Sequence, residues 1–444
     1  MARTSALPAT KIASDLDLGR PVYYAGSSDL GGHAFVCDGY DDNGMFHFNF
    51  GWDGVADGYY TLNDPYGFSN RQAIIHNIYS ANNIPINSDE HGIIYVSQDG
   101  TGNGSSWANA TSELQLAIFK SMVDSTCIWV SQGTYYGLPY NDYAFTLVDR
   151  CRMYGGFKGD EPFDYDLSLR DFEAHPTILD GNQSQGVVEV TATFDNSSTL
   201  IDGFTLQNGK AAQGGGIFIN GNTKVSNCLI TNHNANYGGG ILQCSKRPFS
   251  VVIERCEISN NTASKGGGVY DVGNATYQHC QIHHNTVGQE GGDLMCNNSN
   301  NNEQSIFIGC TVCNNTAQAG GGLYSGTSKA TFWSCIFNNN TAQTGGGCKL
   351  LKNAKLYNCT IVKNEAIDNQ LSWMSTITKW DIYHPHQMPQ QPLFPEARRQ
   401  TLKQSRPYYA NSILRQIHQK RPYFLVDHLA QGHSVGTQLF LIVI

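Results

Sequence analysis

Between residues 201 and 366, apolar and polar positions repeat in one fixed pattern. A cysteine recurs every 24 to 30 residues, Phe204 takes its place in the first unit, and an apolar residue follows two positions later. The cysteines are Cys228, Cys256, Cys280, Cys310, Cys335 and Cys359, and the apolar residues are Leu206, Ile230, Ile258, Ile282, Val312, Phe337 and Ile361. Because alternate residues of a strand face the same side, both columns are predicted to point into a core.

Two polar columns accompany each cysteine. Asparagine stands five positions later in Asn261, Asn285, Asn315, Asn340 and Asn364, with His233 as an exception. A glycine run begins ten positions later at Gly214, Gly238, Gly266, Gly320 and Gly345, with Glu290 in one unit. The interval of ten never varies, whereas the interval from the glycine to the next cysteine ranges from 14 to 20. Insertions are therefore confined to one loop of each unit.

A second apolar column lies three positions before the cysteine, in Val225, Ile253, Tyr277, Phe307, Phe332 and Leu356. A separation of three cannot stay on one face of a straight strand, so the chain must bend between the two columns. With the strand that follows the glycine run, the pattern predicts three short strands per unit. Stacked in parallel about 4.8 Å apart, such units form a right-handed parallel β-helix.

The cysteine column is interpreted as buried core, and the asparagine column as a ladder of hydrogen bonds to backbone groups at the corners. Neighbouring thiols in such a column lie near the strand spacing, farther apart than the bond of about 2.05 Å in a disulfide. Cys310 and Cys313 form a C-x-x-C motif, but residues three apart on a strand face opposite sides. We therefore expect no shared metal there.

The repeats, for example CEISNNTASKGGGVY and CIFNNNTAQTGGGCK, resemble the GGA-and-FxxN repeats of polymorphic outer-membrane proteins and related bacterial surface β-helices. Upstream, IIYVSQDGTGNGSSWANATSELQLAI (93–118), IWVSQGTY (128–135), YGGFKGDE (154–161) and TILDGN (177–182) resemble the opening segment of such helices. The outward positions beside the cysteines hold one carboxylate, Glu257, among twelve residues. A polysaccharide lyase needs a carboxylate cluster, so display or adhesion is the expected role of the helix.

The first 80 residues show a different pattern. The strand-like runs PVYY, HAFVCDGY, MFHFNF and GYYTL alternate with glycine and Asp-Asn turns, which predicts a compact antiparallel sheet. The order GRPVYYAGS, GGHAFVCDGY, FHFNFGW and GYY resembles the C-terminal half of the streptopain-like cysteine peptidases, family C10, of the papain-like class. The resemblance implies that His33 is the general base, that Asn49 orients it, and that Trp52 forms a wall of the site. Phe50 replaces the first tryptophan of the family's N-W-G-W run.

The nucleophile of such a site does not appear in the sequence. None of the 32 residues before His33 is cysteine. Cys37 lies four positions along the same predicted strand and is not expected to reach His33. His47 is interpreted as a strand residue with a solvent face, and a role as second base is left open. We therefore expect that the catalytic cysteine lies upstream of this sequence and that the chain as given is inactive.

Charge and composition add limits. The 47 glycines and 23 tyrosines fit a mainly β protein rich in turns. Residues 1–366 carry 20 basic and 33 acidic residues, which argues against nucleic acid as a partner. The sequence has no run of 18 or more apolar residues, so no membrane span is predicted. The first residues also lack an export signal, and we expect that signal to be missing from this chain. No motif predicts a metal, nucleotide or other cofactor.

The last part of the chain departs from the repeat. Residues 367–444 hold 2 glycines, 6 prolines and a net charge of +4, and Asn369 stands where the next glycine run is due. A capping domain is one interpretation. We prefer an irregular, disordered tail that arises from a shifted reading frame, since neither strand alternation nor a helical stripe is present.

The sequence thus predicts a mainly β chain in five parts: a C10 half-domain (1–80), a linker (81–92), an opening β-helix segment (93–200), β-helix repeats (201–366) and an irregular tail (367–444). The predicted function is that of a fragment of a secreted or surface cysteine endopeptidase that acts on proteins. The alternative is a non-enzymatic surface β-helix, for adhesion or display, that carries a peptidase relic. Host or matrix surface ligands are further expected partners.

Overall fold

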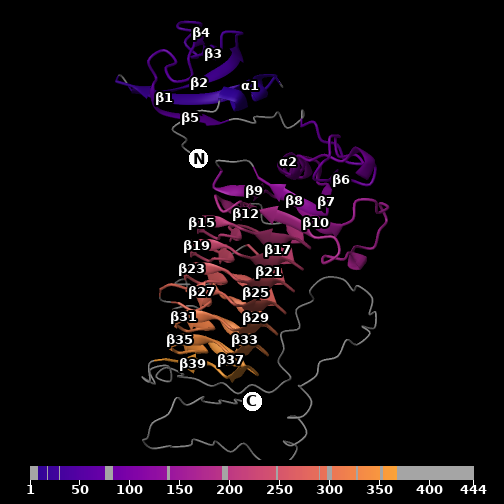
Figure 1. The fold of residues 1–444 in the computed structure, drawn as a ribbon, viewed down its shortest axis with the longest axis vertical. Helices are drawn as coiled ribbons and strands as arrows, with labels where there is room; N and C mark the ends of the chain where they lie inside the picture. Colours follow the sequence, from indigo (N-terminus) through magenta and orange to yellow (C-terminus); the bar gives the residue numbers. More distant parts are fainter. Residues whose placement is uncertain are drawn as a thin grey trace, which may run out of the picture. The chain divides into compact units, whose positions relative to one another are not determined.

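The computed structural model describes residues 9–17, 19–29, 31–75, 84–137, 141–192, 199–246, 249–289, 291–297, 303–326, 329–350 and 354–367. They form an N-terminal antiparallel sheet and a parallel β-solenoid (Figure 1). The mainly β class and the order of the two parts were predicted correctly from the sequence. The prediction of an irregular tail falls, from residue 368 on, outside the described residues.

The N-terminal unit is a five-stranded sheet in the order β4-β3-β2-β1-β5 with one helix, α1. The elements are α1 (Ala9–Asp17), β1 (Val22–Ser28), β2 (Gly31–Tyr40), β3 (Phe46–Asn49), β4 (Gly58–Tyr60) and β5 (Asn70–Ile75). Every pair of neighbouring strands is antiparallel. Helix α1 buries Ile12 against the sheet, where it joins an aromatic core that includes Tyr24, Phe35 and Phe48.

The solenoid is built from four parallel sheets, with one strand of each sheet in a complete turn. The first sheet contains β6 (Ile93–Val96), β7 (Cys127–Ser131), β10 (Arg152–Phe157), β13 (Leu200–Asp202), β17 (Thr223–Ser226), β21 (Val251–Glu254), β25 (Ala275–Gln278), β29 (Ile306–Ile308), β33 (Thr331–Trp333) and β37 (Lys355–Tyr357). The second contains β8 (Gly133–Tyr136), β11 (Thr177–Asp180), β14 (Thr205–Gln207), β18 (Leu229–Thr231), β22 (Glu257–Ser259), β26 (Gln281–His283), β30 (Thr311–Cys313), β34 (Ile336–Asn338) and β38 (Thr360–Val362).

The other two sheets lie on either side of the glycine run. The sheet before it contains β15 (Lys210–Gln213), β19 (Asn234–Tyr237), β23 (Thr262–Lys265), β27 (Thr286–Val287), β31 (Thr316–Ala319), β35 (Thr341–Thr344) and β39 (Glu365–Ala366). The sheet after it contains β9 (Tyr143–Leu147), β12 (Gly186–Val190), β16 (Ile217–Ile219), β20 (Ile241–Gln243), β24 (Val269–Asp271), β28 (Leu294–Cys296), β32 (Leu323–Ser325) and β36 (Cys348–Leu350).

The prediction of three strands per unit is wrong, because the structure has a fourth between the asparagine and the glycine run. Its inward residues are mostly alanines, such as Ala263 and Ala317, so no alternation of large apolar and polar residues marks it in the sequence. The corner that follows requires glycine. Gly266 has a φ of +65°, and a Cβ atom there would lie 2.6 Å from the carbonyl oxygen of Val269.

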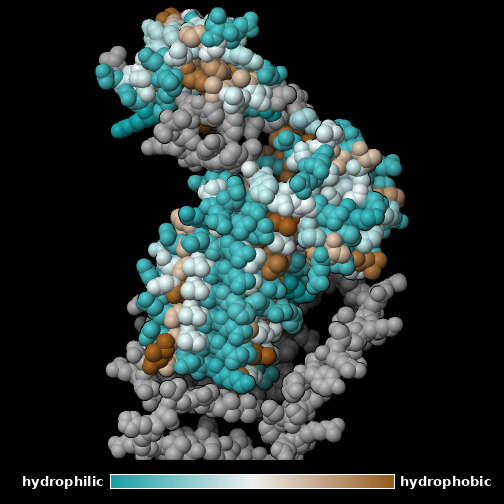
Figure 2. Space-filling model, in the orientation of Figure 1, coloured by the Kyte–Doolittle hydropathy of each residue, from teal (hydrophilic) through white to brown (hydrophobic). Residues whose placement is uncertain are grey.

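The predicted core columns are confirmed. The six repeat cysteines are buried and free, and the apolar residues two positions later fill the same continuous core. In the first sheet the ring of Phe307 stacks between Tyr277, at 4.4 Å between centroids, and Phe332, at 4.7 Å. In the view of Figure 2, a hydrophilic (teal) band runs along the solenoid, so that polar side chains cover this face.

The asparagine ladder is also confirmed. The side-chain nitrogen of Asn285 donates to the carbonyl of Ile258 at 3.0 Å, and its side-chain oxygen accepts from the backbone N–H of Asn261 at 2.9 Å. Asn315 and Asn340 repeat both contacts one and two turns farther on. Each amide thus satisfies a donor and an acceptor that the corner removes from the sheets.

One end of the solenoid is covered by helix α2 (Leu114–Asp124), which packs on β6, β7 and β9 and buries Ala117 and Ile118 in the core. Two residues of the predicted linker, Ile84 and Ile86, are buried in the same core.

Short 3₁₀ turns occur at Trp107–Asn109 and Leu167–Leu169. No helix in the described part of the chain is long and apolar enough to span a membrane.

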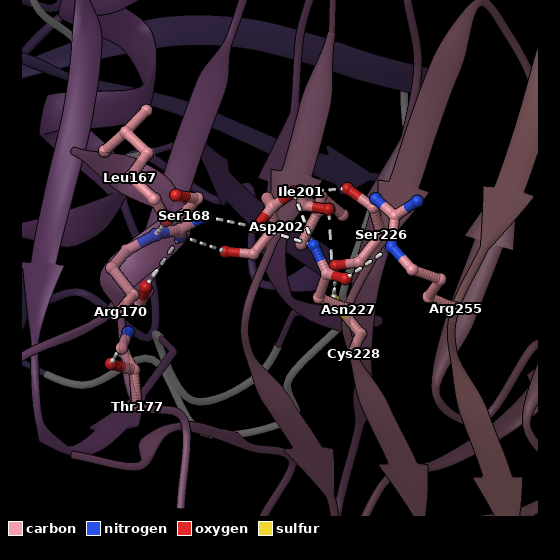
Figure 3. A network of polar contacts seen from close by, with 12 residues as sticks. Leu167, Ser168, Arg170, Thr177, Ile201, Asp202, Ser226, Asn227, Cys228 and Arg255 are labelled. Carbon is pink, nitrogen blue, oxygen red and sulfur yellow. Dashed lines mark hydrogen bonds and ion pairs between the residues drawn. The ribbon is translucent and has the colours of Figure 1, made fainter. Parts of the chain in front are cut away.

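A polar network holds the loop of the second 3₁₀ turn against the solenoid (Figure 3). The Arg170 guanidinium lies 2.6 Å from the Asp202 carboxylate, which also accepts hydrogen bonds from Ser226 and Asn227. The Asn227 side-chain oxygen accepts from Arg255 at 2.9 Å. Every charged group in this network has a partner, so the network serves structure and leaves no free group for chemistry.

Candidate functional site

His33 lies near the start of strand β2, on the face that packs against the aromatic core. By strand alternation it shares this face with the buried residues Phe35 and Cys37. Across the ladder it pairs with Gly26 of β1. A Cβ atom on Gly26 would lie 2.6 Å from the carbonyl oxygen of Phe68, so glycine at this position lets the loop that carries Phe68 approach the histidine.

One hydrogen bond orients the His33 ring. Its Nε2 atom lies 2.8 Å from the carbonyl oxygen of Phe50, and since a carbonyl can only accept, Nε2 carries the proton and donates it. In the neutral ring this leaves the lone pair on Nδ1, for which the described residues provide no hydrogen-bond partner. The imidazole is therefore held in the tautomer in which Nδ1 can act as a base.

Aromatic rings pack around the same imidazole. The Trp52 ring stacks on His33, with 4.5 Å between centroids and an angle of 21° between planes. Phe68 lies at 5.6 Å and Phe50 at 6.3 Å. Phe50 and Phe68 are buried, whereas Trp52 is 38% exposed. Trp52 therefore separates the His33 imidazole from solvent.

The loop after β3 supplies both Trp52 and the Phe50 carbonyl. The Phe50 N–H donates to the Asp57 carboxylate at 2.9 Å, and the Gly51 N–H donates to the side-chain oxygen of Asn49, also at 2.9 Å. The structure thus brings Trp52 to His33, whereas the Asn49 oxygen is used within the loop. The backbone carbonyl that holds His33 and the supporting carboxylate of Asp57 escaped the sequence prediction, since no side-chain motif marks a main-chain acceptor.

Cys37 does not reach His33. The two residues share a face of β2, but four residues of extended strand separate their Cα atoms by about 13 Å. The Cys37 side chain is fully buried, and this burial raises the pKa of its thiol to about 12. A thiol with that pKa stays protonated at neutral pH and is a poor nucleophile.

His47 faces the other side of the sheet, because its neighbours Phe46 and Phe48 point into the core. Its Nδ1 atom lies 2.5 Å from the Asp38 carboxylate, and its ring packs edge-to-face on Tyr59. The hydrogen bond to Asp38 and the opposite face keep His47 away from His33. A role as second base at the same site is thus not supported by the geometry.

Comparison with known proteins finds two family matches. Residues 3–60 match the Peptidase C10 family, and residues 215–379 match the right handed beta helix region. The predicted resemblance to the C10 peptidases and the predicted right-handed β-helix are thereby confirmed.

Several cysteine proteases are similar to part of this chain. Thiol protease/hemagglutinin PrtT of Porphyromonas gingivalis is 31% identical over 161 residues, which are 36% of this chain and 15% of that protein. Streptopain of Streptococcus pyogenes is 47% identical over 53 residues, 12% of this chain and 13% of the relative. The solved structure of Prevotella intermedia interpain A cysteine protease is 32% identical with a TM-score of 0.17, over 18% of this chain and 38% of that one. The chain thus spans only a small part of the length of these relatives.

Proposed function

We propose that the N-terminal unit is the histidine-bearing half of a cysteine peptidase site that acts on protein substrates, with His33 as its general base. The observation that carries this proposal is the hydrogen bond from His33 Nε2–H to the Phe50 carbonyl, because it leaves the lone pair of the neutral ring on Nδ1. Such a base draws the proton from a cysteine thiol, and the thiolate attacks the peptide carbonyl. The matches to the Peptidase C10 family support the same chemistry.

The other predicted site residues have roles around this base. Trp52 forms one wall of the site by stacking on the imidazole. Asn49 acts as a positioning residue, since its side chain holds the loop that presents the Phe50 carbonyl. The ring of Tyr66 lies 6.3 Å from that of Trp52 and both side chains are exposed, so a cysteine-bearing segment or a substrate can pack on them.

We further propose that the chain as given does not hydrolyse peptide bonds, since Cys37 is buried, protonated and about 13 Å from the base. The test is casein hydrolysis by the full chain, alone and mixed with a separately produced cysteine-bearing half of a Peptidase C10 relative. We expect hydrolysis only in the mixture, equal for the wild type and for His47→Asn, and absent for His33→Asn.

Two results would overturn this proposal. One is a mixture that stays inactive or is equally active with His33→Asn. The other is casein hydrolysis by the chain alone that disappears in Cys37→Ala, which would show that the buried thiol is the nucleophile.

For the solenoid we propose display outside the cell, with host or matrix surfaces as ligands. The support is the likeness to a bacterial protein named as both thiol protease and hemagglutinin. The test is binding of the purified full chain to erythrocytes and to immobilised matrix proteins, with the result compared to a β-solenoid of similar charge. Binding equal to that control would contradict the proposal.

A further inference from the structure

A cluster of metal-ligand side chains lies on the outer face of the solenoid, outside the peptidase-like unit. His283 ends strand β26, Cys313 ends β30, and the two residues pair in register on consecutive turns. Side chains in register on neighbouring parallel strands stack about 4.8 Å apart, so the sulfur and the imidazole are neighbours although 30 positions separate them in the sequence. Cys313 faces outward, unlike the six buried repeat cysteines, which include its C-x-x-C partner Cys310.

Both nitrogens of the His283 ring have partners. Nε2 lies 3.3 Å from the Glu257 carboxylate on the preceding turn, and Nδ1 lies 2.8 Å from Nδ1 of His284. The carboxylate fixes the His283 tautomer, because only a protonated Nε2 faces an anion favourably. His283 Nδ1 then carries a lone pair, and His284 Nδ1–H donates to it.

This arrangement is that of a metal-binding histidine with its supporting carboxylate. A ligating histidine commonly donates its other ring N–H to a carboxylate, which orients the ring and raises its basicity. The Glu257 carboxylate lies 3.3 Å from His283 Nε2 in the corresponding position, and the hydroxyl of Ser259 donates to the same Glu257 oxygen at 3.3 Å. The carboxylate is thus itself held in place.

A catalytic pair of Cys313 and His283 is a poorer interpretation of the same residues. Neither ring nitrogen of His283 is free to accept the thiol proton, because Nε2 faces the Glu257 carboxylate and Nδ1 faces Nδ1 of His284. A metal ion could be bound by the same residues, because it takes the place of the proton between the two imidazoles and stabilises the Cys313 thiolate.

We propose that His283, His284 and Cys313 bind a zinc-type divalent cation, with solvent in the fourth position. Zinc–nitrogen bonds of about 2.0–2.1 Å in a tetrahedral site place two nitrogens about 3.3 Å apart, so the two Nδ1 atoms separate by about 0.5 Å on binding. Among the described residues no three such side chains converge on one point as they stand, and the third ligand therefore joins by rotation of the Cys313 side chain. His284 moves its proton from Nδ1 to Nε2, and the Cys313 thiol releases one proton to solvent for each ion bound.

The repeat itself supplies the variants for the test. His284 has a φ of +55° at a corner where the neighbouring turns have Asn260 and Asn314, so His284→Asn removes a ligand and suits the backbone. Cys313→Ser removes the sulfur at an outward position. His279→Asn is the matched control, since it removes an exposed histidine from a different corner of the solenoid.

The experiment is a Co²⁺ titration of the full chain and each variant, followed by absorption and by proton release. We expect one high-affinity equivalent with a sulfur-to-cobalt charge-transfer band and one proton released, unchanged in His279→Asn. His284→Asn should weaken this equivalent at least tenfold, and Cys313→Ser should abolish the band. Glu257→Gln should weaken binding by about 10- to 100-fold. No high-affinity equivalent, a band that persists in Cys313→Ser, or unchanged affinity in His284→Asn would overturn the proposal.

Discussion

His233 should make the solenoid sensitive to acid, and replacing it with asparagine should remove that sensitivity. This residue occupies the asparagine column and imitates an amide with its ring. Nδ1 accepts the Gly209 N–H at 2.8 Å, and Nε2–H donates to the Leu206 carbonyl at 3.0 Å. Protonation would put a hydrogen on Nδ1, facing the Gly209 N–H, and would bury a charge.

The size of the effect follows from the pKa of the ring. Burial lowers the pKa of His233 from 6.5 to about 3. In the unfolded chain the ring binds a proton below about pH 6.5, whereas in the folded chain it stays neutral down to about pH 3. Stability from His233 is therefore fully present above pH 6.5 and is lost as the pH falls. The loss is about 2 kcal/mol at pH 5 and about 3 kcal/mol at pH 4.

The assay is urea denaturation of the wild type and of His233→Asn at pH 7.5, 5 and 4, followed by circular dichroism. All other titrating groups act equally in both proteins, so the change with pH in the difference between their free energies of unfolding reports on His233. We expect that difference to shift by about 2 kcal/mol in favour of the variant between pH 7.5 and 5. His279→Asn, which removes an exposed histidine, is the matched control. A difference independent of pH would show that the buried ring is not the acid-sensitive group.

Three further predictions concern packing and reactivity. Phe307→Ala should lower the free energy of unfolding by about 3–5 kcal/mol, because the ring is fully buried between two stacked neighbours; a loss under about 1 kcal/mol in urea denaturation would contradict this. Gly26→Ala should destabilise the N-terminal unit by about 1–3 kcal/mol and displace Phe68, since the new Cβ would lie 2.6 Å from the Phe68 carbonyl oxygen; an unchanged thermal transition would exclude that contact. Cys37 should resist iodoacetamide in the native protein at pH 8 and react after denaturation, as peptide mass spectrometry would show; rapid native labelling would mean that its thiol is neither buried nor of raised pKa.

The sequence predicted some columns of the repeat correctly and missed one of the four sheets. The asparagine column was correctly predicted as a hydrogen-bond ladder because its interval from the cysteine never varies, so each residue must meet the same corner in every turn. The exception, His233, fits the same column because an imidazole has one donor and one acceptor, as the role requires. The fourth sheet was missed, since its inward residues are too small to mark a strand.

The candidate N-terminal site shows which contacts a sequence motif can indicate. His33 and Trp52 were selected from the motif, and the structure stacks their rings. The atom that orients His33 is the Phe50 carbonyl, and a main-chain acceptor has no counterpart in a side-chain pattern. Asn49 was expected beside the histidine, but a tight turn uses its oxygen locally, at the Gly51 N–H.

The sequence by itself determined the solenoid, because a parallel stack requires the same few contacts in every turn and so imposes a period that can be counted. Only the tertiary structure decided which groups meet across turns or through the backbone. Cys313 lies beside His283 because strand register joins residues 30 positions apart, and the loop between them varies in length from turn to turn. The constant spacing of the repeat along the chain therefore predicts the fold of this protein. The contacts that make its candidate sites depend on strand register and main-chain hydrogen bonds, which the spacing does not reveal.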